Sequence, residues 1–578
     1  MNADALLYAD CVDRFVDMQA LPFLVEKGLD RTRRLYDAGA VRGQWESMIS
    51  DVAAGRKTES LFQLYVNVPF CRQLCHFCNL NAVGLRSPDE TGRYVASLVE
   101  SIHFFAPTFS GVAFRSLFFG GGTPSILSAA EMDEVLSALR GSFEISSVGE
   151  RCMEVHPDSF TEDKLEVVAR HGINKINFGV QSMDRSVLAG ENRDDQGRRD
   201  VIARARAIRA CKAIRCLNID LILGLRADTE AKFKKSFAEA VDLEPDTITV
   251  YPLHPTGPYL SRFYGGSLRE FYLAFDRLSP LIVGSVREFA ATCSYRLEIH
   301  PDRWYFRRAG GSSADEYGGY ADRAAQPVSV LGLGPRARSH ISGTFAYSHR
   351  AEVDEPFEPR TRAYRGHEVD PILERLKFVL GELLSSAKIS RADFSALFCG
   401  DITECFGDGL RALQEAGRSR VEADFVHFAG VDARERLIDA LSLIGTIRLR
   451  AMLDSYNYGN FRFAMSVEER PWQVWVERTG EGETSAYLLR VGDFGLALAG
   501  PRAGAQASPL EAKVLHVLKS IFTVLAKRSS HLCADELTLL LQRALKRAGG
   551  HPESWFPSSG LSIFEPAASR GVGADGKC

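Results

Sequence analysis

Six short apolar runs between residues 61 and 255 constrain the fold of this chain most. Each is rich in β-branched or aromatic residues, and amphipathic helical segments fill the gaps between them. The runs are Leu64–Val68, Ser116–Phe119, Cys152–Val155, Lys175–Val180, Leu217–Leu223 and Thr247–Leu253. Runs of this kind are typical of buried parallel strands, which right-handed helical crossovers connect. A closed barrel of this type has eight strand–helix steps, so six steps predict an α/β fold with an open, partial (β/α)6 barrel.

The segments outside residues 61–255 have a different character. Residues 1–60 predict a helical N-terminal segment, and residues 256–430 predict an extension that ends in a helical domain. Residues 431–548 predict an extra α+β domain of unknown role, because Phe461–Val467, Gln473–Arg478 and Thr484–Val491 alternate like antiparallel strands and Ser508-Pro509 opens a helix. Residues 549–578 are rich in Gly, Ser and Pro, which predicts a loose tail.

The composition excludes several classes of protein. With 25% charged and 45% hydrophobic residues, the chain of 578 residues is too apolar to be disordered. A net charge of -4 gives no reason to expect a nucleic-acid or membrane-surface partner. We find no uncharged apolar run long enough to span a membrane. The N-terminus has acidic residues where a signal peptide has a basic start followed by an apolar core. We therefore expect a cytoplasmic protein.

Three of the twelve cysteines stand together directly after the first predicted strand. They form the run Cys71-Arg-Gln-Leu-Cys75-His-Phe-Cys78. Three thiolates on one tight loop suit a [4Fe-4S] cluster and leave one of its irons free to bind something else. A structural zinc site needs a fourth ligand, and His76 lies inside the loop, where it could hardly turn inward beside Cys75. The loop therefore predicts iron–sulfur chemistry in a reducing compartment.

A second loop follows the second predicted strand and contains Gly120, Gly121, Gly122 and Thr123. Glycines at this place let the backbone approach a ligand closely, although a plain turn is an open alternative. The ligands of parallel sheets bind at the carboxyl ends of the strands, where both loops emerge. We therefore expect the cysteines and the glycines to lie near one another.

Seven phrases in order resemble the radical S-adenosylmethionine (SAM) superfamily, and most closely its branch with the oxygen-independent coproporphyrinogen III oxidases. They are Leu64–Cys78 (LYVNVPFCRQLCHFC), Phe118–Pro124 (FFGGGTP), Glu154–Pro157 (EVHP), Asn177–Ser182 (NFGVQS), Glu191–Arg193 (ENR), Asn218–Leu225 (NIDLILGL) and Val250–Leu253 (VYPL). A weaker likeness continues through Val330–Ser339 (VLGLGPRARS) to about residue 430.

The resemblance implies cofactors and their contacts. Cys71, Cys75 and Cys78 would ligate a [4Fe-4S] cluster that reductively cleaves SAM, with electrons from a flavodoxin or ferredoxin. Two SAM molecules are implied. The expected contacts of the first are Tyr65, Gly121 and Glu154; those of the second are Phe77, Gly122, Thr123, Gln181, Arg193 and Asp220. The open alternatives are that Glu154 and Asp220 are satisfied polar groups at strand ends and that Arg193 is a solvated charge.

One departure from the family directs the prediction of the reaction. The coproporphyrinogen oxidases carry a further cysteine where this chain has Leu80, which counts against porphyrinogen decarboxylation. We therefore predict a class C methyltransferase or cyclopropanase, with the second SAM as methylene donor to an sp2 carbon of a small, natural-product-like substrate. Tyr251 or His254 would be the base, and the C-terminal domain could dock a carrier protein. The alternatives are tetrapyrrole chemistry, either coproporphyrinogen decarboxylation or heme ring-opening methylation, and a heme chaperone.

A second departure lies in the phrase LGLGPRARS. Arg336 and Arg338 stand where apolar or small residues are usual in the family. They could bind an anionic group of the substrate or lie on the surface, and the sequence leaves both open.

Overall fold

The computed structural model describes most of the barrel and separate parts of the chain beyond it. The described residues are 34–54, 61–299, 304–310, 328–349, 363–368, 387–430 and the strands between 461 and 498, with single gaps at 81, 254, 267 and 399 and a few isolated residues elsewhere. Two compact units divide the chain, and the first contains Asp30–Cys405 with the whole barrel.

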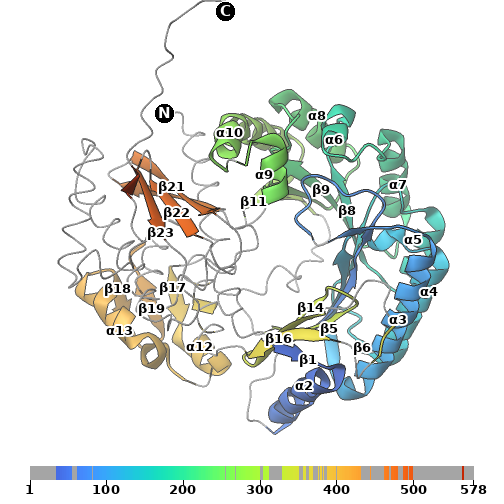
Figure 1. The fold of residues 1–578 in the computed structure, drawn as a ribbon, viewed down its shortest axis with the longest axis horizontal. Coiled ribbons are helices and arrows are strands. Elements are labelled where there is room, and N and C mark those ends of the chain that lie inside the picture. The colour runs from blue at the N-terminus through green and yellow to red at the C-terminus, as the bar shows by residue number, and fades with distance from the viewer. Residues whose placement is uncertain are drawn as a thin grey trace, which may run out of the picture. The chain divides into compact units, whose positions relative to one another are not determined.

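The six predicted strands form one continuous parallel sheet. They are β2 (Leu61–Val68), β5 (Ala113–Gly121), β7 (Arg151–Val155), β8 (Lys175–Gln181), β9 (Cys216–Leu223) and β10 (Thr247–Pro252). Each pairs in parallel with the next, in chain order. The sheet curves, and Figure 1 shows the connecting helices along its outer side. The prediction of an α/β partial barrel is therefore confirmed.

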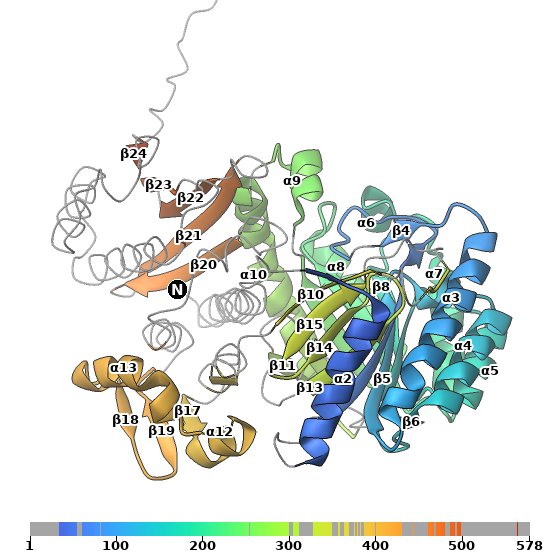
Figure 2. The ribbon, with the colours of Figure 1, turned by 60° about the horizontal axis from the view of Figure 1, so that its bottom comes forward.

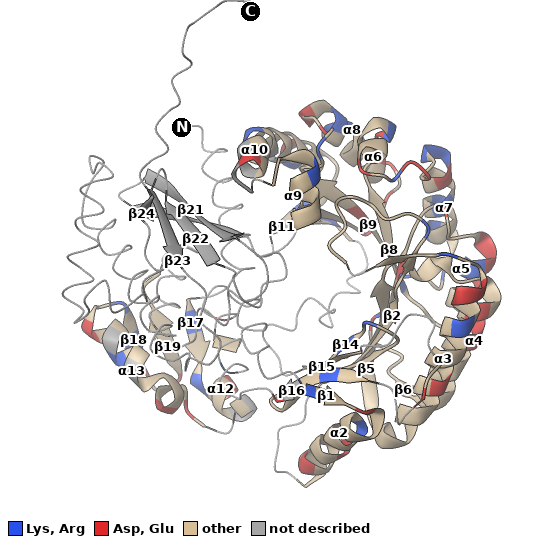
Figure 3. Ribbon diagram, in the orientation of Figure 1, with Lys and Arg blue, Asp and Glu red and all other residues tan. Residues whose placement is uncertain are grey.

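Helices connect successive strands and cover one face of the sheet. They are α3 (Asp89–Phe105), α4 (Ala129–Ser142), α5 (Glu162–Arg170), α6 (Arg185–Gly190), α7 (Arg198–Ala210) and α8 (Glu230–Val241). The capping box that opens α4 is present, with Ser128 and Glu131 bonded reciprocally. Charged residues gather on these outer helices in Figure 3, whereas the strands are mostly uncharged.

The sheet extends beyond the six strands on both sides. β13 (Val328–Leu333) adds a seventh parallel strand beside β2 and is followed outward by β14 (Arg338–Ile341), β15 (Phe345–His349), β16 (Tyr364–Glu368) and β1 (Arg34–Tyr36). On the other side lie β12 (Trp304–Arg308) and β11 (Tyr295–Ile299), which follow α9 (Gly257–Phe263) and the long α10 (Leu268–Thr292). Part of the predicted extension 256–430 thus continues the barrel sheet.

The N-terminal segment contributes both a helix and an edge strand. The helix α2 (Ala38–Ala53) agrees with the prediction and lies across β14 and β15 in Figure 2. Its buried Trp45 indole donates to the Tyr347 hydroxyl at 2.8 Å. The strand β1 was not predicted, because three residues, Arg-Leu-Tyr, show too little alternation to be recognised.

The two faces of the central strands have different environments. On β2, Phe62 points to the outer side, where it meets Phe109 and Phe114 among buried aromatic rings. Since successive side chains of a strand alternate, Tyr65 and Asn67 occupy the inner face. The inner face is the polar one, which places the chemistry inside the curve of the sheet.

Two further groups of elements follow the barrel. The first combines α12 (Arg391–Phe398) and α13 (Ile402–Glu415) with the small sheet of β17 (Lys388–Ser390), β19 (Phe425–Phe428) and β18 (Ser419–Val421), so the predicted helices are joined by strands that were not predicted. The second is an antiparallel sheet of β20 (Phe461–Val467), β21 (Arg470–Thr479), β22 (Ala486–Val491) and β23 (Phe494–Leu498), with β24 (Ile563–Phe564) at its edge.

The three strands predicted between 461 and 491 are confirmed by β20, β21 and β22. The helix predicted from Ser508 lies outside the described residues. Across the part of the chain that the structure describes, we find no helix with the length and hydrophobicity needed to cross a membrane.

Candidate active site

The three clustered cysteines lie on a loop at the carboxyl end of β2. The short strands β3 (Phe70–Cys71) and β4 (Val83–Gly84) pair at its base. Cys71, Cys75 and Cys78 are all half-buried free thiols. Within the described residues, no three His, Cys, Asp or Glu side chains converge as they would around a single metal ion. A four-iron cube takes one thiolate per iron, so its ligands do not need to meet at one point.

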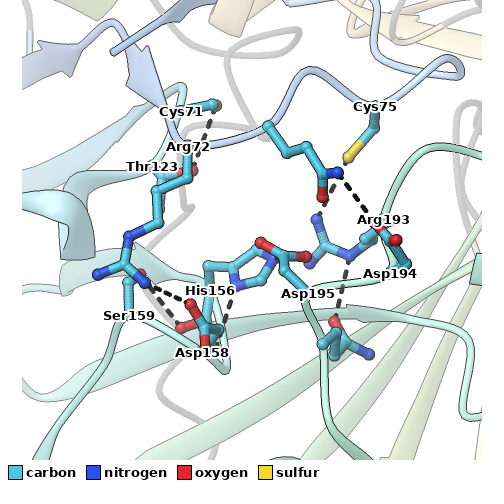
Figure 4. A network of polar contacts seen from close by, with 12 residues as sticks. Cys71, Arg72, Cys75, Thr123, His156, Asp158, Ser159, Arg193, Asp194 and Asp195 are labelled. Carbon is cyan, nitrogen blue, oxygen red and sulfur yellow. Dashed lines mark hydrogen bonds and ion pairs between the residues drawn. The ribbon is translucent and has the colours of Figure 1, made fainter. Parts of the chain in front are cut away.

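Each of the three thiols has a polar neighbour of its own. The Cys71 sulfur lies 3.3 Å from the Thr123 hydroxyl, and the Cys78 sulfur lies 3.9 Å from the Leu80 carbonyl oxygen. The Arg193 guanidinium donates to the Cys75 sulfur at 3.6 Å. Figure 4 shows Cys71 and Cys75 with these partners. The glycine loop and the segment after β8 therefore both reach the cysteine loop.

Burial keeps two of the thiols protonated in the absence of a metal. It raises the pKa of Cys71, against a lowering by the Thr123 hydrogen bond and the Arg193 charge. It raises the pKa of Cys78 to about 11. Binding of iron at these thiols therefore releases protons, as at other thiolate sites.

Three hydrogen bonds fasten the cysteine loop to residues 191–194, which follow α6. The His76 amide donates to the Glu191 carbonyl oxygen at 2.9 Å. The Asn192 side-chain amide donates to the Leu74 carbonyl oxygen at 2.8 Å, and the Gln73 amide donates to the Asp194 carboxylate at 2.9 Å. The loop is thus held by the protein itself.

Each glycine of the second loop leaves room for a neighbour. A Cβ at Gly120 would stand 2.8 Å from the Glu154 carboxylate. One at Gly121, where φ is +110°, would overlap the Asn67 amide. One at Gly122 would stand 2.5 Å from the Phe70 carbonyl oxygen, beside Cys71. The glycines therefore let the ends of β5, β7 and β2 approach one another.

The inner face brings together the side chains expected to contact the first SAM. Tyr65 stacks on Phe118, and its hydroxyl donates to the Asn67 side chain at 2.9 Å. The Asn67 amide donates to the carbonyl oxygen of Pro335, in the loop after β13. Glu154 lies against Gly120, so Tyr65, Gly121 and Glu154 share one region of the barrel mouth.

The expected contacts of the second SAM come from β8, β9 and the two loops. Gln181 ends β8 with φ at +68°, an unusual backbone for a residue other than glycine, at an irregularity in the strand pairing. Asp220 accepts a hydrogen bond of 2.6 Å from Asn218, whose own oxygen accepts from Thr247 and Thr249.

The other residues predicted for SAM binding or as the base lie on different elements. Thr123 lies against Cys71, and Phe77 is half-buried within the cysteine loop. Tyr251 is half-buried near the end of β10, on the same face as Thr249. His254 lies outside the described residues.

The interpretation of Arg193 as a solvated charge is wrong. The residue is 7% exposed, and its other nitrogens bond to the Gln196 oxygen and the Gly179 carbonyl oxygen. The segment around it forms a loop before α7, which turns the guanidinium inward (Figure 4). The bond to Gly179, fourteen residues earlier in the chain, gives no signal in the local sequence.

Two polar residues were not singled out from the sequence. Glu191 is fully buried, accepts from the Tyr259 hydroxyl at 2.9 Å and from the Arg226 amide at 3.0 Å, and has its pKa raised by burial. His156 accepts from the Asp158 amide, and burial, helped by the charges of Arg193 and Arg72, lowers its pKa to about 2. Both lie in quoted motifs, ENR and EVHP, which was the available signal.

Together, the fold and the cysteine loop are characteristic of one class of proteins. Residues 65–240 match the radical SAM superfamily and form a radical SAM domain. This superfamily uses a [4Fe-4S] cluster and SAM, and the three thiols supply the donors that such a cluster takes.

Known proteins give a closer comparison. The chain is 31% identical over 201 residues to the oxygen-independent coproporphyrinogen III oxidase of Escherichia coli, covering 34% of this chain and 43% of that one. It is 28% identical over 190 residues to the heme chaperone HemW of the same organism, covering 33% of this chain and 50% of that one. The matches thus span half or less of these relatives. The solved coproporphyrinogen III oxidase (HemN) from Escherichia coli shares the fold, with a TM-score of 0.54 and 22% identity over 69% of this chain and 92% of that one.

Proposed function

We propose that this chain is a radical SAM enzyme that binds a [4Fe-4S] cluster and two SAM molecules at the barrel mouth and acts on a carboxylated tetrapyrrole. The likeness of the barrel to the coproporphyrinogen III oxidases and to the heme chaperone carries this proposal. It favours the tetrapyrrole alternative over the methylene transfer that the sequence analysis placed first.

Cys71, Cys75 and Cys78 would hold the cluster, with thiol protons released on binding. The chemistry that a bound cluster would supply, once reduced by a flavodoxin or ferredoxin, is the electron for cleavage of SAM to methionine and a 5′-deoxyadenosyl radical. The role of the protein would be to orient the reactants on the inner face.

Two carboxylates have fixed positions on that face. Glu154 is held beside the glycine loop and would bind the ammonium group of the first SAM. Asp220 is oriented by the Asn218 amide, which Thr247 and Thr249 fix in turn, and would accept the ribose hydroxyls of the second. The hydrogen bond from Asn218 orients the Asp220 carboxylate within the protein itself.

The loop after β13 is the proposed contact for the substrate carboxylates. It lies against Asn67 through the Pro335 carbonyl oxygen, at the same edge of the sheet as the cysteine loop. Arg336 is exposed on this loop, with φ at +65°, and Arg338 is exposed at the start of β14. Exposed guanidinium groups at the mouth suit propionate side chains.

Methylene transfer to an sp2 carbon is the second candidate, favoured by one observation. Leu80 occupies the position of the further cysteine of coproporphyrinogen oxidases and is 54% exposed beside Cys78. A leucine cannot serve as a thiol there. In this case the second SAM is the carbon donor and Tyr251 is a candidate base. Docking of a carrier protein by the C-terminal domain belongs to this second candidate.

An isotope experiment separates the candidates. The anaerobically reconstituted, reduced enzyme is given SAM with a trideuterated methyl group, first with coproporphyrinogen III and then with heme. A modified tetrapyrrole supports the proposal: unlabelled 5′-deoxyadenosine accompanies decarboxylation, and deuterated 5′-deoxyadenosine accompanies methylation of the heme. Deuterium in the 5′-deoxyadenosine with both tetrapyrroles unchanged supports methylene transfer to another substrate instead. Tight heme binding with no SAM cleavage and no organic product identifies a chaperone and overturns the enzymatic proposal.

A further inference from the structure

The contact between Arg193 and Cys75 concerns a group that the resemblance assigns to the second SAM. All three guanidinium nitrogens of Arg193 are bonded within the protein. Nη1 donates to the Cys75 sulfur at 3.6 Å, Nε donates to the Gln196 oxygen at 3.1 Å, and Nη2 donates to the Gly179 carbonyl oxygen. These bonds use three of the five N–H donors of the guanidinium and leave two.

The guanidinium is held rigidly in this position. Gln196 is buried and donates to the carbonyl oxygens of Val180 and Ser182, so its own oxygen is fixed for Arg193. Gly179 lies in β8 and does not move independently of the sheet. An arginine fixed on two sides keeps its third contact, which is the Cys75 sulfur.

The residues next to Arg193 hold the cysteine loop in register with it. The Glu191 carbonyl oxygen accepts from the His76 amide, and the Asn192 side chain donates to the Leu74 carbonyl oxygen. Asn192 has φ at +56°, which turns the chain so that these neighbouring contacts form together. The contacts on both sides of Cys75 therefore hold its backbone beside Arg193.

We propose that Arg193 is a positioning residue that raises the reduction potential of the cluster through its hydrogen bond and positive charge at the Cys75 sulfur. Hydrogen bonds to the ligand sulfurs and nearby charge set the potential of iron–sulfur clusters. The one-electron reduced cluster carries one more negative charge than the oxidised one, and a buried cation stabilises it. The inference rests on the proposed function only in requiring a cluster at the three cysteines.

Arg72 provides a matched control. It lies on the same loop, next to Cys71, but its side chain is largely exposed and pairs with Asp158 at 2.6 Å (Figure 4). Arg72→Met therefore removes an exposed, solvent-screened charge from the loop, whereas Arg193→Met removes a buried charge and a bond to a ligand sulfur.

The test is an anaerobic redox titration of the reconstituted full chain, followed by electron paramagnetic resonance without SAM or substrate. Arg193→Met is expected to lower the midpoint potential by about 59 mV or more, which is a tenfold fall in the ratio of reduced to oxidised cluster. Arg193→Lys keeps the positive charge but lacks the planar guanidinium, and is expected to lower the midpoint potential less. Arg72→Met is expected to leave the midpoint potential near the wild-type value.

Iron and sulfide content per chain is measured for every variant. If Arg193→Met does not take up a full cluster, Arg193→Lys is used instead, and its midpoint potential is also expected to be lower than that of the wild type. An unchanged midpoint in a fully loaded Arg193 variant with a raised KM for SAM overturns the inference and returns Arg193 to SAM binding. An equal fall in Arg72→Met also overturns it, since general charge would then be the cause. A wild-type chain that binds no cluster refutes the proposed function instead.

Discussion

At the scale of single residues, the thiols of the cysteine loop must lose a proton to bind iron, but their buried surroundings oppose that loss. Burial raises the pKa of Cys71 and of Cys78, while Thr123 and Arg193 favour the thiolates. Because a metal binds the thiolate, the loss of any one ligand is expected to leave a poorly loaded site.

Cys75→Ser tests this expectation directly. We expect the visible absorbance of the reconstituted cluster and reductive SAM cleavage to fall to background, because a serine hydroxyl is a poor ligand for iron. Cys211→Ser is the control, because Cys211 follows α7 on the outer side of the sheet. This substitution should leave the absorbance and the SAM cleavage intact. SAM cleavage that survives in Cys75→Ser would contradict the assignment of the ligands.

A second prediction at this scale concerns Asp228, which is 7% exposed. Burial raises its pKa to about 7, although the Thr229 amide and Lys232 lower it. A carboxyl group with a raised folded pKa stabilises the protein below its unfolded pKa of about 3.9, and that stabilisation is lost as pH rises to about 7. Asp228→Asn should remove this loss.

The measurement is chemical denaturation of wild type and Asp228→Asn at two pH values. At pH 8 the variant should be more stable by up to about 4 kcal/mol, which is three pKa units at 1.36 kcal/mol each. At pH 5 the gain should be much smaller. A gain of the same size at both pH values would mean that the charge of Asp228 is not its cause.

A site residue can be predicted from the sequence when its role depends on neighbours close to it in the chain. The three cysteines and the glycines are recognisable because their spacing is local. The burial of Arg193 depends on Gly179 and Gln196, and that of Glu191 on Tyr259, which is far along the chain. Long-range packing of this kind is not visible in a local pattern.

At the scale of elements, the glycine loop shows why strand ends matter. Gly120, Gly121 and Gly122 let three strand ends come together, with the Glu154 carboxylate against Gly120. The strands themselves follow from apolar runs, and all six were predicted. The seventh parallel strand, β13, was not predicted as part of the barrel, because 75 residues separate Pro252 from Val328 and periodicity gives no pairing partner.

Gly120→Ala is a prediction about this arrangement. The added methyl group would stand 2.8 Å from the Glu154 carboxylate and from the Phe118 ring, so the carboxylate must shift. We expect the Kd for SAM to rise at least tenfold, about 1.4 kcal/mol, measured by isothermal titration with the reconstituted protein.

Gly141→Ala is the matched control for that experiment. Gly141 lies in α4, where an added Cβ meets nothing within 4 Å. An alanine within a helix should stabilise it by about 0.5–1 kcal/mol and leave SAM binding unchanged. If Gly120→Ala binds SAM as Gly141→Ala does, Glu154 does not contact SAM.

At the scale of the whole molecule, the question is whether the cluster holds the barrel together. Small zinc domains unfold without their metal because the ligands are their main long-range contacts. Here the sheet is complete without the cysteine loop, and its outer face is closed by a core that includes Phe62, Phe114 and Phe178. The loop is also bonded to residues 191–194 through protein atoms alone.

Removal of the cluster should therefore separate function from folding. After oxidation and chelation of the iron, we expect SAM binding to be lost, while the far-ultraviolet circular dichroism stays unchanged and the Tm falls by less than about 5 °C, since 1 kcal/mol corresponds to roughly 2–4 °C in a domain of this size. Reconstitution with iron and sulfide should restore SAM binding without refolding. A Tm that falls by more than about 15 °C, or a loss of helical signal, would show instead that the cluster is a structural part of the barrel, and the hydrogen bonds to residues 191–194 would then be too weak to hold the loop alone.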